Sequence, residues 1–230
     1  MSRTVIITGG SSGIGKALGA ALVARGDDVV LAARTEADVR RAAGELTAQG
    51  PGRARGAVLD VRNAGEVADL VNDVYRSYGR LDLMINNAGI NVIGFAHELT
   101  PDCWERVYDT NVRGVLHGTA AAYPLMIKQG YGQIANTASL AGLVPAPLPG
   151  PYTMTKHALV GLTMSLRVEA RAYGVRVNLI CPASSRHPCS IRAARLACRP
   201  RRMSSPTPAA CCGMPPTALL TRPAAWRGKS

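Results

Sequence analysis

The chain has 230 residues, of which 27 are basic and 15 acidic, and its formal net charge is +12. Its length suits one sizeable domain with its own hydrophobic core. The charge first suggests a nucleic-acid or membrane partner. However, residues 1–183 carry 18 basic and all 15 acidic residues, a net of +3, so the last 47 residues carry the other 9 basic groups. We therefore predict that the body of the chain binds neither nucleic acid nor membrane.

Membrane, export and metal signals are absent from the sequence pattern. No uninterrupted apolar run reaches the roughly 20 residues that a membrane span needs, and the first predicted strand begins at residue 4 without a charged leader and apolar signal core. The cysteines fit no zinc-binding spacing, so no metal site is predicted. We expect a cytoplasmic protein.

Short apolar runs alternate with helical patterns along the chain. The predicted strands are 4–8, 28–33, 56–61, 81–86, 132–139 and 175–181, and the helices after the first five are 14–25, 35–49, 64–78, 101–129 and 152–173. Because parallel strands need crossover connections, this alternation predicts an α/β fold, a doubly wound parallel sheet with helices on both faces. Ligands of such sheets bind beyond the carboxyl ends of the strands.

A glycine-rich loop, TGGSSGIG at residues 8–15, follows the first predicted strand. Gly9, Gly13 and Gly15 would allow a tight turn and a close approach of the backbone to a pyrophosphate, while the helix start offers unpaired N–H groups. A simple turn between strand and helix is the alternative interpretation. The position directly after a strand favours phosphate binding.

The second predicted strand ends in Ala32, Ala33 and Arg34. A carboxylate here would bind the ribose hydroxyl of NAD, whereas small residues followed by arginine leave space and a bidentate donor for the 2′-phosphate of NADP. We therefore predict NADP(H) as the preferred cofactor and NAD(H) as the alternative. Arg34 could instead cap a solvated strand end, and Asp60 is either an ordinary turn residue or a partner of the adenine amino group.

Five further features complete a recognisable set: Asp60, NNAG at 86–89, Asn111, Ser139 and the pair Tyr152 and Lys156. With the glycine loop, they make residues 3–183 resemble the short-chain dehydrogenase/reductase family. The resemblance implies a Rossmann-like single domain over 1–183 and an NAD(P)(H)-dependent oxidoreductase acting on alcohols and ketones. The cofactor-binding residues that it implies are Gly9, Ser11, Ser12, Gly13, Ile14, Gly15, Arg34, Asp60, Val61, Asn87, Ala88, Gly89, Tyr152, Lys156 and Pro182.

The predicted catalytic residues are Asn111, Ser139, Tyr152 and Lys156. Tyr152 and Lys156 lie four residues apart on a predicted helix, so they share one face, and an ammonium near a phenol favours the phenolate. Tyr152 would then be the general acid and base for a small carbonyl or alcohol substrate, and Ser139 would hydrogen-bond the substrate oxygen. By similarity to the family, Asn111 would anchor a water that relays protons through Lys156.

Two further expectations concern surfaces. The apolar segment 143–151, with four prolines, is predicted to form one wall of the substrate pocket. The resemblance also implies a homodimer formed through the helices at 101–129 and 152–173, and leaves tetramer formation open.

The pattern of the family breaks after Ala183. Residues 184–230 contain seven prolines and nine basic residues with no acid, a composition unlike a packed domain. We interpret this tail as disordered or as an out-of-frame product, since codons for Arg186, His187 and Pro188 can hide a family-like Asp-Thr one frame away. A basic nucleic-acid or membrane arm and an ordered lid are the alternatives. Without a substrate lid, the chain could be a catalytically impaired cofactor-binding protein instead of an active enzyme.

Overall fold

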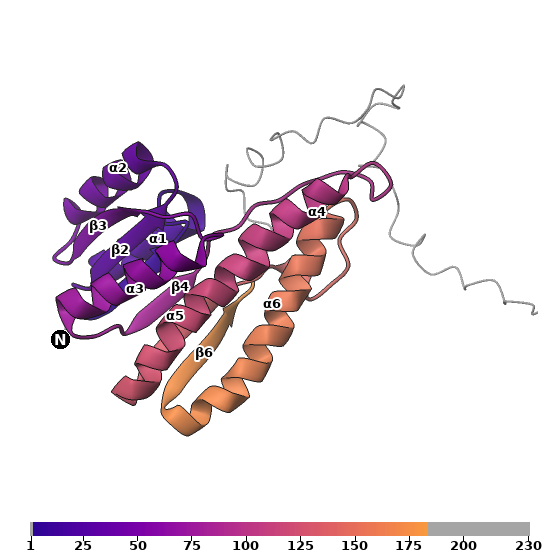
Figure 1. Ribbon diagram of the computed structural model, residues 1–230. Coiled ribbons are helices and arrows are strands. Elements are labelled where there is room, and N and C mark those ends of the chain that lie inside the picture. The colour runs from indigo at the N-terminus through magenta and orange to yellow at the C-terminus, as the bar shows by residue number, and fades with distance from the viewer. Residues whose placement is uncertain (1, 184–230) are drawn as a thin grey trace, which may run out of the picture. The chain divides into compact units, whose positions relative to one another are not determined.

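The computed structural model describes residues 2–183, which form a six-stranded parallel sheet with helices on both faces (Figure 1). The strand order is β3-β2-β1-β4-β5-β6. The strands are β1 (Thr4–Thr8), β2 (Asp28–Ala33), β3 (Arg53–Val58), β4 (Leu83–Asn86), β5 (Gly132–Thr137) and β6 (Val175–Ile180). This order and the parallel pairing confirm the predicted doubly wound, Rossmann-like architecture.

Within residues 2–183, six α-helices connect or flank the strands. They are α1 (Gly13–Val23), α2 (Glu36–Thr47), α3 (Ala64–Tyr78), α4 (Pro101–Tyr108), α5 (Gly114–Gln129) and α6 (Gly150–Glu169). A π-helical turn, η1 (Asp109–Arg113), joins α4 to α5, and short 3₁₀ turns lie at η2 (Leu140–Gly142) and η3 (Ala170–Tyr173). The helix predicted over 101–129 is therefore interrupted by a π turn, and the strand predicted at 56–61 lies at 53–58.

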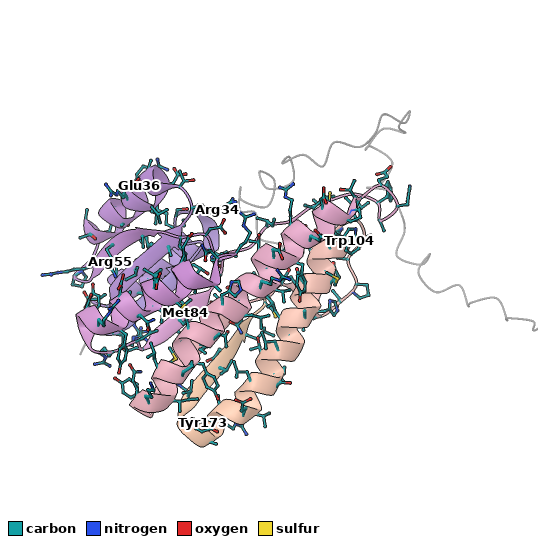
Figure 2. The ribbon with its side chains drawn as sticks, in the orientation of Figure 1. Arg34, Glu36, Arg55, Met84, Trp104 and Tyr173 are labelled. Carbon is teal, nitrogen blue, oxygen red and sulfur yellow. The ribbon has the colours of Figure 1, made fainter. Side chains whose placement is uncertain are left out.

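The two faces of the sheet have separate hydrophobic cores. Successive side chains of a strand point to opposite faces, so Ile6 and Met84 lie in the core beneath α3, α5 and α6, whereas Val5 and Ile7 lie in the core beneath α1 and α2. Met84, in the middle of the sheet, is fully buried (Figure 2). The near-continuous burial of β1 and β4 is typical of central parallel strands covered on both faces.

The position of β1 determines where a ligand can bind. β1 pairs with β2 on one side and with β4 on the other, so the crossover connections leave β1 in opposite directions. In a doubly wound sheet, a crevice opens at this reversal, beyond the carboxyl ends of the strands. The loops after β1 and β4 begin there, and they contain the glycine-rich loop and the NNAG segment.

Some predictions concern residues outside the described part. The domain boundary at 183, and all interpretations of residues 184–230 as disordered, out-of-frame, an arm or a lid, fall on or beyond its edge. Within residues 2–183, none of the helices has the length and apolar character to cross a bilayer.

Candidate active site

The glycine loop turns sharply because two of its positions have no space for a side chain. Gly9 has a φ of +66°, and a Cβ there would lie 2.9 Å from the Ala88 Cα. A Cβ at Gly15 would lie 2.4 Å from the carbonyl oxygen of Gly9. Glycine at both positions therefore lets the start of α1 pack directly against the loop.

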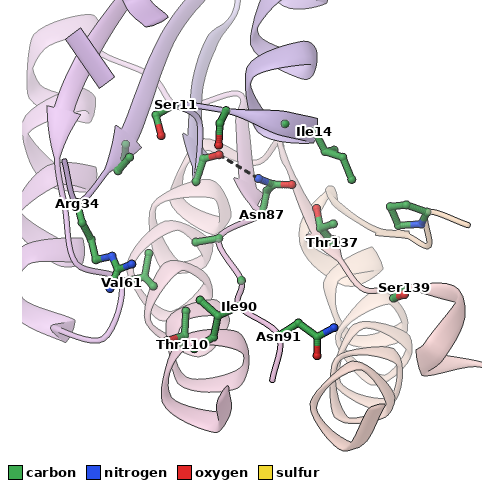
Figure 3. A pocket seen from close by; sticks show the side chains of 18 of the residues that line it. Ser11, Ile14, Arg34, Val61, Asn87, Ile90, Asn91, Thr110, Thr137 and Ser139 are labelled. Atoms are coloured by element: carbon green, nitrogen blue, oxygen red, sulfur yellow. Dashed lines mark hydrogen bonds between the residues drawn. The ribbon is translucent and has the colours of Figure 1, made fainter. Parts of the chain in front are cut away.

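Asn87 and Thr8 hold this loop against the end of β4. The Asn87 Nδ2 donates to the carbonyl oxygens of Thr8 at 3.1 Å and Gly9 at 3.3 Å (Figure 3). The Thr8 Oγ1 accepts from the backbone amides of Asn87 and Ala88, at 3.0 and 3.1 Å. At the start of α1, the N-cap residue Ser12 makes no side-chain capping hydrogen bond, so the first-turn N–H groups are free of that partner and suit an anion.

A cavity of about 500 Å³ runs along the carboxyl ends of the strands (Figure 3). Its lining residues are Gly9, Ser11, Ser12, Gly13, Ile14, Ala32, Ala33, Arg34, Thr35, Leu59, Asp60, Val61, Asn87, Ala88, Gly89, Ile90, Asn91, Thr110, Thr137, Ala138, Ser139, Tyr152, Lys156, Pro182 and Ala183. Every predicted site residue except Gly15 and Asn111 is in this wall. Gly15 packs behind the loop, and Asn111 lies beneath the cavity floor.

One end of the cavity is charged. Arg34 follows β2, and Figure 3 shows its side chain beside Val61. The Asp60 carboxylate accepts from the Arg62 guanidinium, with Nε 3.0 Å from both oxygens and Nη2 2.5 Å from Oδ2. This hydrogen bonding is the main cause that lowers the pKa of Asp60, and the charge of Arg34 adds to it. The end of β2 itself has no acidic side chain to meet a ribose hydroxyl.

At the other end, α6 and the turn after β5 bring three predicted catalytic residues together. Tyr152 lies one helical turn before Lys156, whose Nζ is 5.3 Å from the Tyr152 ring centroid. The Lys156 Nζ also donates to the carbonyl oxygen of Thr137 at 2.7 Å. Ser139 caps η2, with its Oγ accepting from the Ala141 amide at 3.2 Å. These side chains therefore converge where β5 ends.

The close approach of η2 to α6 sets the spacing of Ser139 and Tyr152. A Cβ at Gly142 would lie 2.6 Å from the carbonyl oxygen of Lys156 and 3.1 Å from its Cβ. Only glycine allows this contact without moving the turn. Gly142 thus holds the serine-bearing turn against the helix that carries Tyr152.

Burial controls the ionisation of both groups on α6. It raises the pKa of Tyr152, and the neighbouring Ser139 hydroxyl opposes that rise. Burial lowers the pKa of Lys156 to about 8, with Cys181 opposing. In the protein without cofactor, burial is the main influence on the pKa of Tyr152 and raises it, so a lowering of this pKa by Lys156 together with a positively charged nicotinamide stays a prediction. Without cofactor, the phenol is therefore protonated at neutral pH.

Asn111 lies in the π turn between α4 and α5 and is fully buried. Its Oδ1 accepts from the Ile90 amide at 2.8 Å, and its Nδ2 donates to the Ile90 carbonyl at 2.9 Å and the Thr155 Oγ1 at 3.1 Å. The side chain thus ties the loop after β4 to α6. Its role in a proton relay stays a prediction. π turns of this kind are frequent at functional sites.

Several wall residues had no signal in the sequence beyond their place after a strand. They are Thr35, Leu59, Ile90, Asn91, Thr110, Thr137, Ala138 and Ala183. By contrast, the segment predicted as a wall, 143–151, does not line the cavity. It lies beside the loop after β4 instead, where the Gly94 amide donates to the Leu148 carbonyl at 3.1 Å.

Two polar atoms of the wall indicate that the cavity suits a ligand with hydrogen-bonding groups. Asn91 Oδ1 and Thr137 Oγ1 are buried without a hydrogen-bond partner in the described part of the chain. Buried polar atoms are rarely left unpaired in proteins. With the uncapped α1 start and the glycine loop, they fit a dinucleotide that spans the cavity.

Comparison with known proteins agrees with this geometry. The family model described as short chain dehydrogenase matches residues 3–191. D-beta-hydroxybutyrate dehydrogenase of Rhizobium meliloti is 34% identical over 186 residues, covering 79% of this chain and 71% of that protein. Two solved structures are also similar: a variant of actinorhodin polyketide ketoreductase with NADPH (TM-score 0.80, 34% identity, 83% and 74% coverage) and NAD+-bound xylitol dehydrogenase (TM-score 0.76, 31% identity, 79% and 70% coverage). The motifs, the strand order and these matches together show that the chain belongs to the short chain dehydrogenase family and is an oxidoreductase.

Proposed function

We propose that the protein interconverts a ketone or aldehyde and an alcohol, with NADP(H) as the preferred nicotinamide cofactor. The observation that carries this proposal is the convergence of Ser139, Tyr152 and Lys156 at one end of a cavity. The other end of that cavity is lined by the glycine loop and Arg34. The cavity thus joins a candidate proton donor to residues that would bind a dinucleotide.

The cofactor would lie along the ends of the strands. The glycine loop and the start of α1 would bind its pyrophosphate, Asp60 its adenine, and the NNAG loop the region leading to the nicotinamide. When bound, the nicotinamide supplies or accepts the hydride. Arg34 would contact the 2′-phosphate of NADP, because a guanidinium matches a phosphate bidentately and the end of β2 has no carboxylate to repel it.

Tyr152 would move the proton. In reduction its hydroxyl donates a proton to the substrate oxygen, and in oxidation it takes that proton back. The phenol is protonated at neutral pH at its ordinary pKa, and burial raises that pKa further, so a proton is available for reduction. Ser139 would hold the substrate oxygen beside that hydroxyl. Lys156, in the cavity wall, would contact the cofactor and orient it. Asn111 would act as a positioning residue through Ile90 and Thr155.

We also propose a homodimer. Leu116 on α5 and Met164 and Val168 on α6 are large apolar side chains with exposed fractions of 38%, 52% and 71%. The two helices lie side by side on the outer surface (Figure 1). A second copy would cover this surface in the four-helix arrangement that the family resemblance implies. The tetramer and the cytoplasmic location stay predictions.

Cofactor titration and turnover test the function. The purified chain should bind NADPH, and should reduce members of a ketone panel with consumption of NADPH. Tyr152→Phe should keep the cofactor affinity and lose turnover by about 100-fold or more, since it removes the proton. Turnover that survives in Tyr152→Phe would contradict the mechanism. Binding of NADPH without turnover of any ketone or alcohol would favour the impaired cofactor-binding protein.

A further inference from the structure

Two arginines influence the carboxylate of Asp60 at the charged end of the cavity. Arg62 bonds it directly: its Nε lies 3.0 Å from both carboxylate oxygens, its Nη2 lies 2.5 Å from Oδ2, and its backbone amide donates to Oδ1 at 3.0 Å. These hydrogen bonds lower the pKa of Asp60 most, and the charge of Arg34, in the same wall, lowers it further. Arg34 is therefore close enough to act on this carboxylate, but Arg62 forms the ion pair with it.

The start of α3 fixes the backbone that carries this ion pair. The Asp60 amide donates to the Glu66 Oε2 at 3.0 Å, and the Asn63 Nδ2 donates to the Glu66 Oε1 at 2.9 Å. Asn63 in turn caps α3, with its Oδ1 accepting from the Glu66 amide at 3.3 Å. Exposed ion pairs usually contribute little. A fork-shaped pair on a backbone held in this way keeps its geometry, so Arg62 stays on Asp60.

An unpaired carboxylate at this place would oppose the binding of NADP. In the proposed function, Arg34 contacts the 2′-phosphate and Asp60 meets the adenine of the same nucleotide. Because a phosphate monoester carries about two negative charges, a nearby free carboxylate would repel it. The same carboxylate would also compete with the phosphate for the guanidinium of Arg34. NAD escapes both effects, because it has a hydroxyl where NADP has the phosphate.

We propose that Arg62 determines cofactor specificity by pairing with Asp60, which keeps that carboxylate from repelling the 2′-phosphate of NADP and leaves Arg34 available to it. Arg62 acts through Asp60 and is a positioning residue. The inference rests on the proposed function and adds to it a residue that is not among those lining the cavity in the described part of the chain. Because the effect runs through one carboxylate, removing the charge of that carboxylate should cancel it.

The ratio of the Kd of NADPH to the Kd of NADH tests this role on the full chain. Arg62→Ala leaves the Asp60 carboxylate unpaired, so the ratio should rise by about fivefold, the effect of one unpaired charge near a phosphate in water. The Kd of NADH should change less than about twofold. Asp109, whose charge also reaches Arg62, keeps its own partner, Arg113, at 3.5 Å. If both cofactors bind equally more weakly, Arg62 only supports the fold and the proposal fails.

A second substitution separates this role from direct contact between Arg62 and the phosphate. Asp60→Asn keeps the shape of the side chain and removes its charge. Added to Arg62→Ala, it should return the ratio to within about twofold of the wild-type value, because the repelling charge has gone. The ratio cancels any change in the contact with adenine, which both cofactors share. A ratio that stays raised in the double variant would show that Arg62 binds the phosphate itself, and would overturn the proposal.

Arg76→Ala is the matched control. Arg76 lies in the last turn of α3 and pairs with Asp73 at 2.5 Å, so this variant also removes one positive charge and leaves one carboxylate unpaired. The ratio should stay within about twofold of the wild-type value, because this pair is at the other end of the helix. A rise equal to that of Arg62→Ala would show an effect of net charge and overturn the assignment. A wild-type chain that binds neither cofactor would overturn the proposed function itself, so the two failures are distinguishable.

Discussion

Arg34 decides the cofactor preference in the proposed function, and it can be tested by itself. Replacing it with alanine removes the guanidinium that would pair with the 2′-phosphate, so Arg34→Ala should raise the Kd of NADPH by about tenfold or more. The Kd of NADH should change less than about twofold. Fluorescence titration with both cofactors measures the two values.

A matched control removes the same charge elsewhere. Arg40 lies on the exposed side of α2, where it pairs with Glu36 at 2.6 Å and does not line the cavity. Arg40→Ala should leave both Kd values within about twofold. If Arg34→Ala and Arg40→Ala weaken NADPH equally, the effect is one of net charge and the assignment of Arg34 fails.

The buried ammonium of Lys156 predicts a pH dependence of stability. Its pKa falls from 10.5 to about 8 on folding, so between these values the unfolded chain binds more protons and the free energy of unfolding rises with pH. The change amounts to about 3 kcal/mol over this range. The Lys156→Met variant has no ammonium and therefore lacks this pH-dependent change. We expect the free energy of unfolding of the wild type minus that of Lys156→Met, measured by urea unfolding without cofactor, to increase from pH 7 to pH 10.5. A difference that stays constant with pH would refute the buried-ammonium explanation.

The packing of the turn η2 against helix α6 predicts that the position of Ser139 depends on Gly142. Gly142→Ala would place a methyl 2.6 Å from the Lys156 carbonyl, so the turn must move away and take Ser139 with it. We expect kcat/KM to fall by about 100-fold, since a displacement near 1 Å costs this much. The Kd of NADPH should change little, because the glycine loop follows β1 whereas η2 follows β5.

Gly44 supplies the control on α2. It lies inside the helix with no atom within 4 Å of an added Cβ, so Gly44→Ala should stabilise the fold by about 0.5–1 kcal/mol and leave turnover unchanged. Thermal unfolding and steady-state kinetics compare the two variants. Normal kinetics in Gly142→Ala would show that η2 does not position Ser139.

Element order was predictable because apolar runs and helical periods are local signals, but details set by tertiary contacts were not. Helix α3 matches its predicted range, since Asn63 caps its start and Gly79 ends it in the left-handed region. Strand β3 begins earlier than predicted, because its exposed edge carries arginines and its apolar pattern is weak. The π turn that contains Asn111 could not be predicted, because it leaves no mark on the 3.6-residue pattern of apolar residues in the sequence.

The candidate site was predictable for similar reasons. Motif residues such as Ser139 and Tyr152 follow strands or begin helices, where ligands bind, and most of them line the cavity. Asn91 and Thr137 were missed because only the folded structure shows that each has a buried polar atom without a hydrogen-bond partner in the cavity wall, among residues 2–183. The rise that burial causes in the pKa of Tyr152 could not be predicted either, because burial is a property of the whole packing and not of the spacing to Lys156.

At the scale of the whole molecule, the apolar surface of α5 and α6 predicts self-association. The double variant Met164→Glu and Val168→Glu places two charges on it and should convert a dimer into a monomer by light scattering after gel filtration. Val58→Glu is the matched control, because Val58 is 57% exposed at the end of the edge strand β3. A double variant that stays dimeric would place the interface elsewhere.

The central place of β1 also has a consequence for synthesis. β1 leaves the ribosome before its neighbour β4, with which it pairs Val5 opposite Leu83, and the Thr4 amide donates to Asp82 Oδ2 at 2.8 Å, 78 residues later. The newborn chain can pair β1 with β2 and β3 early, but one edge of β1 stays open until β4 emerges. At about 5–20 residues per second, that wait lasts several seconds, so the glycine loop gains its neighbouring NNAG loop only after β4 has been synthesised.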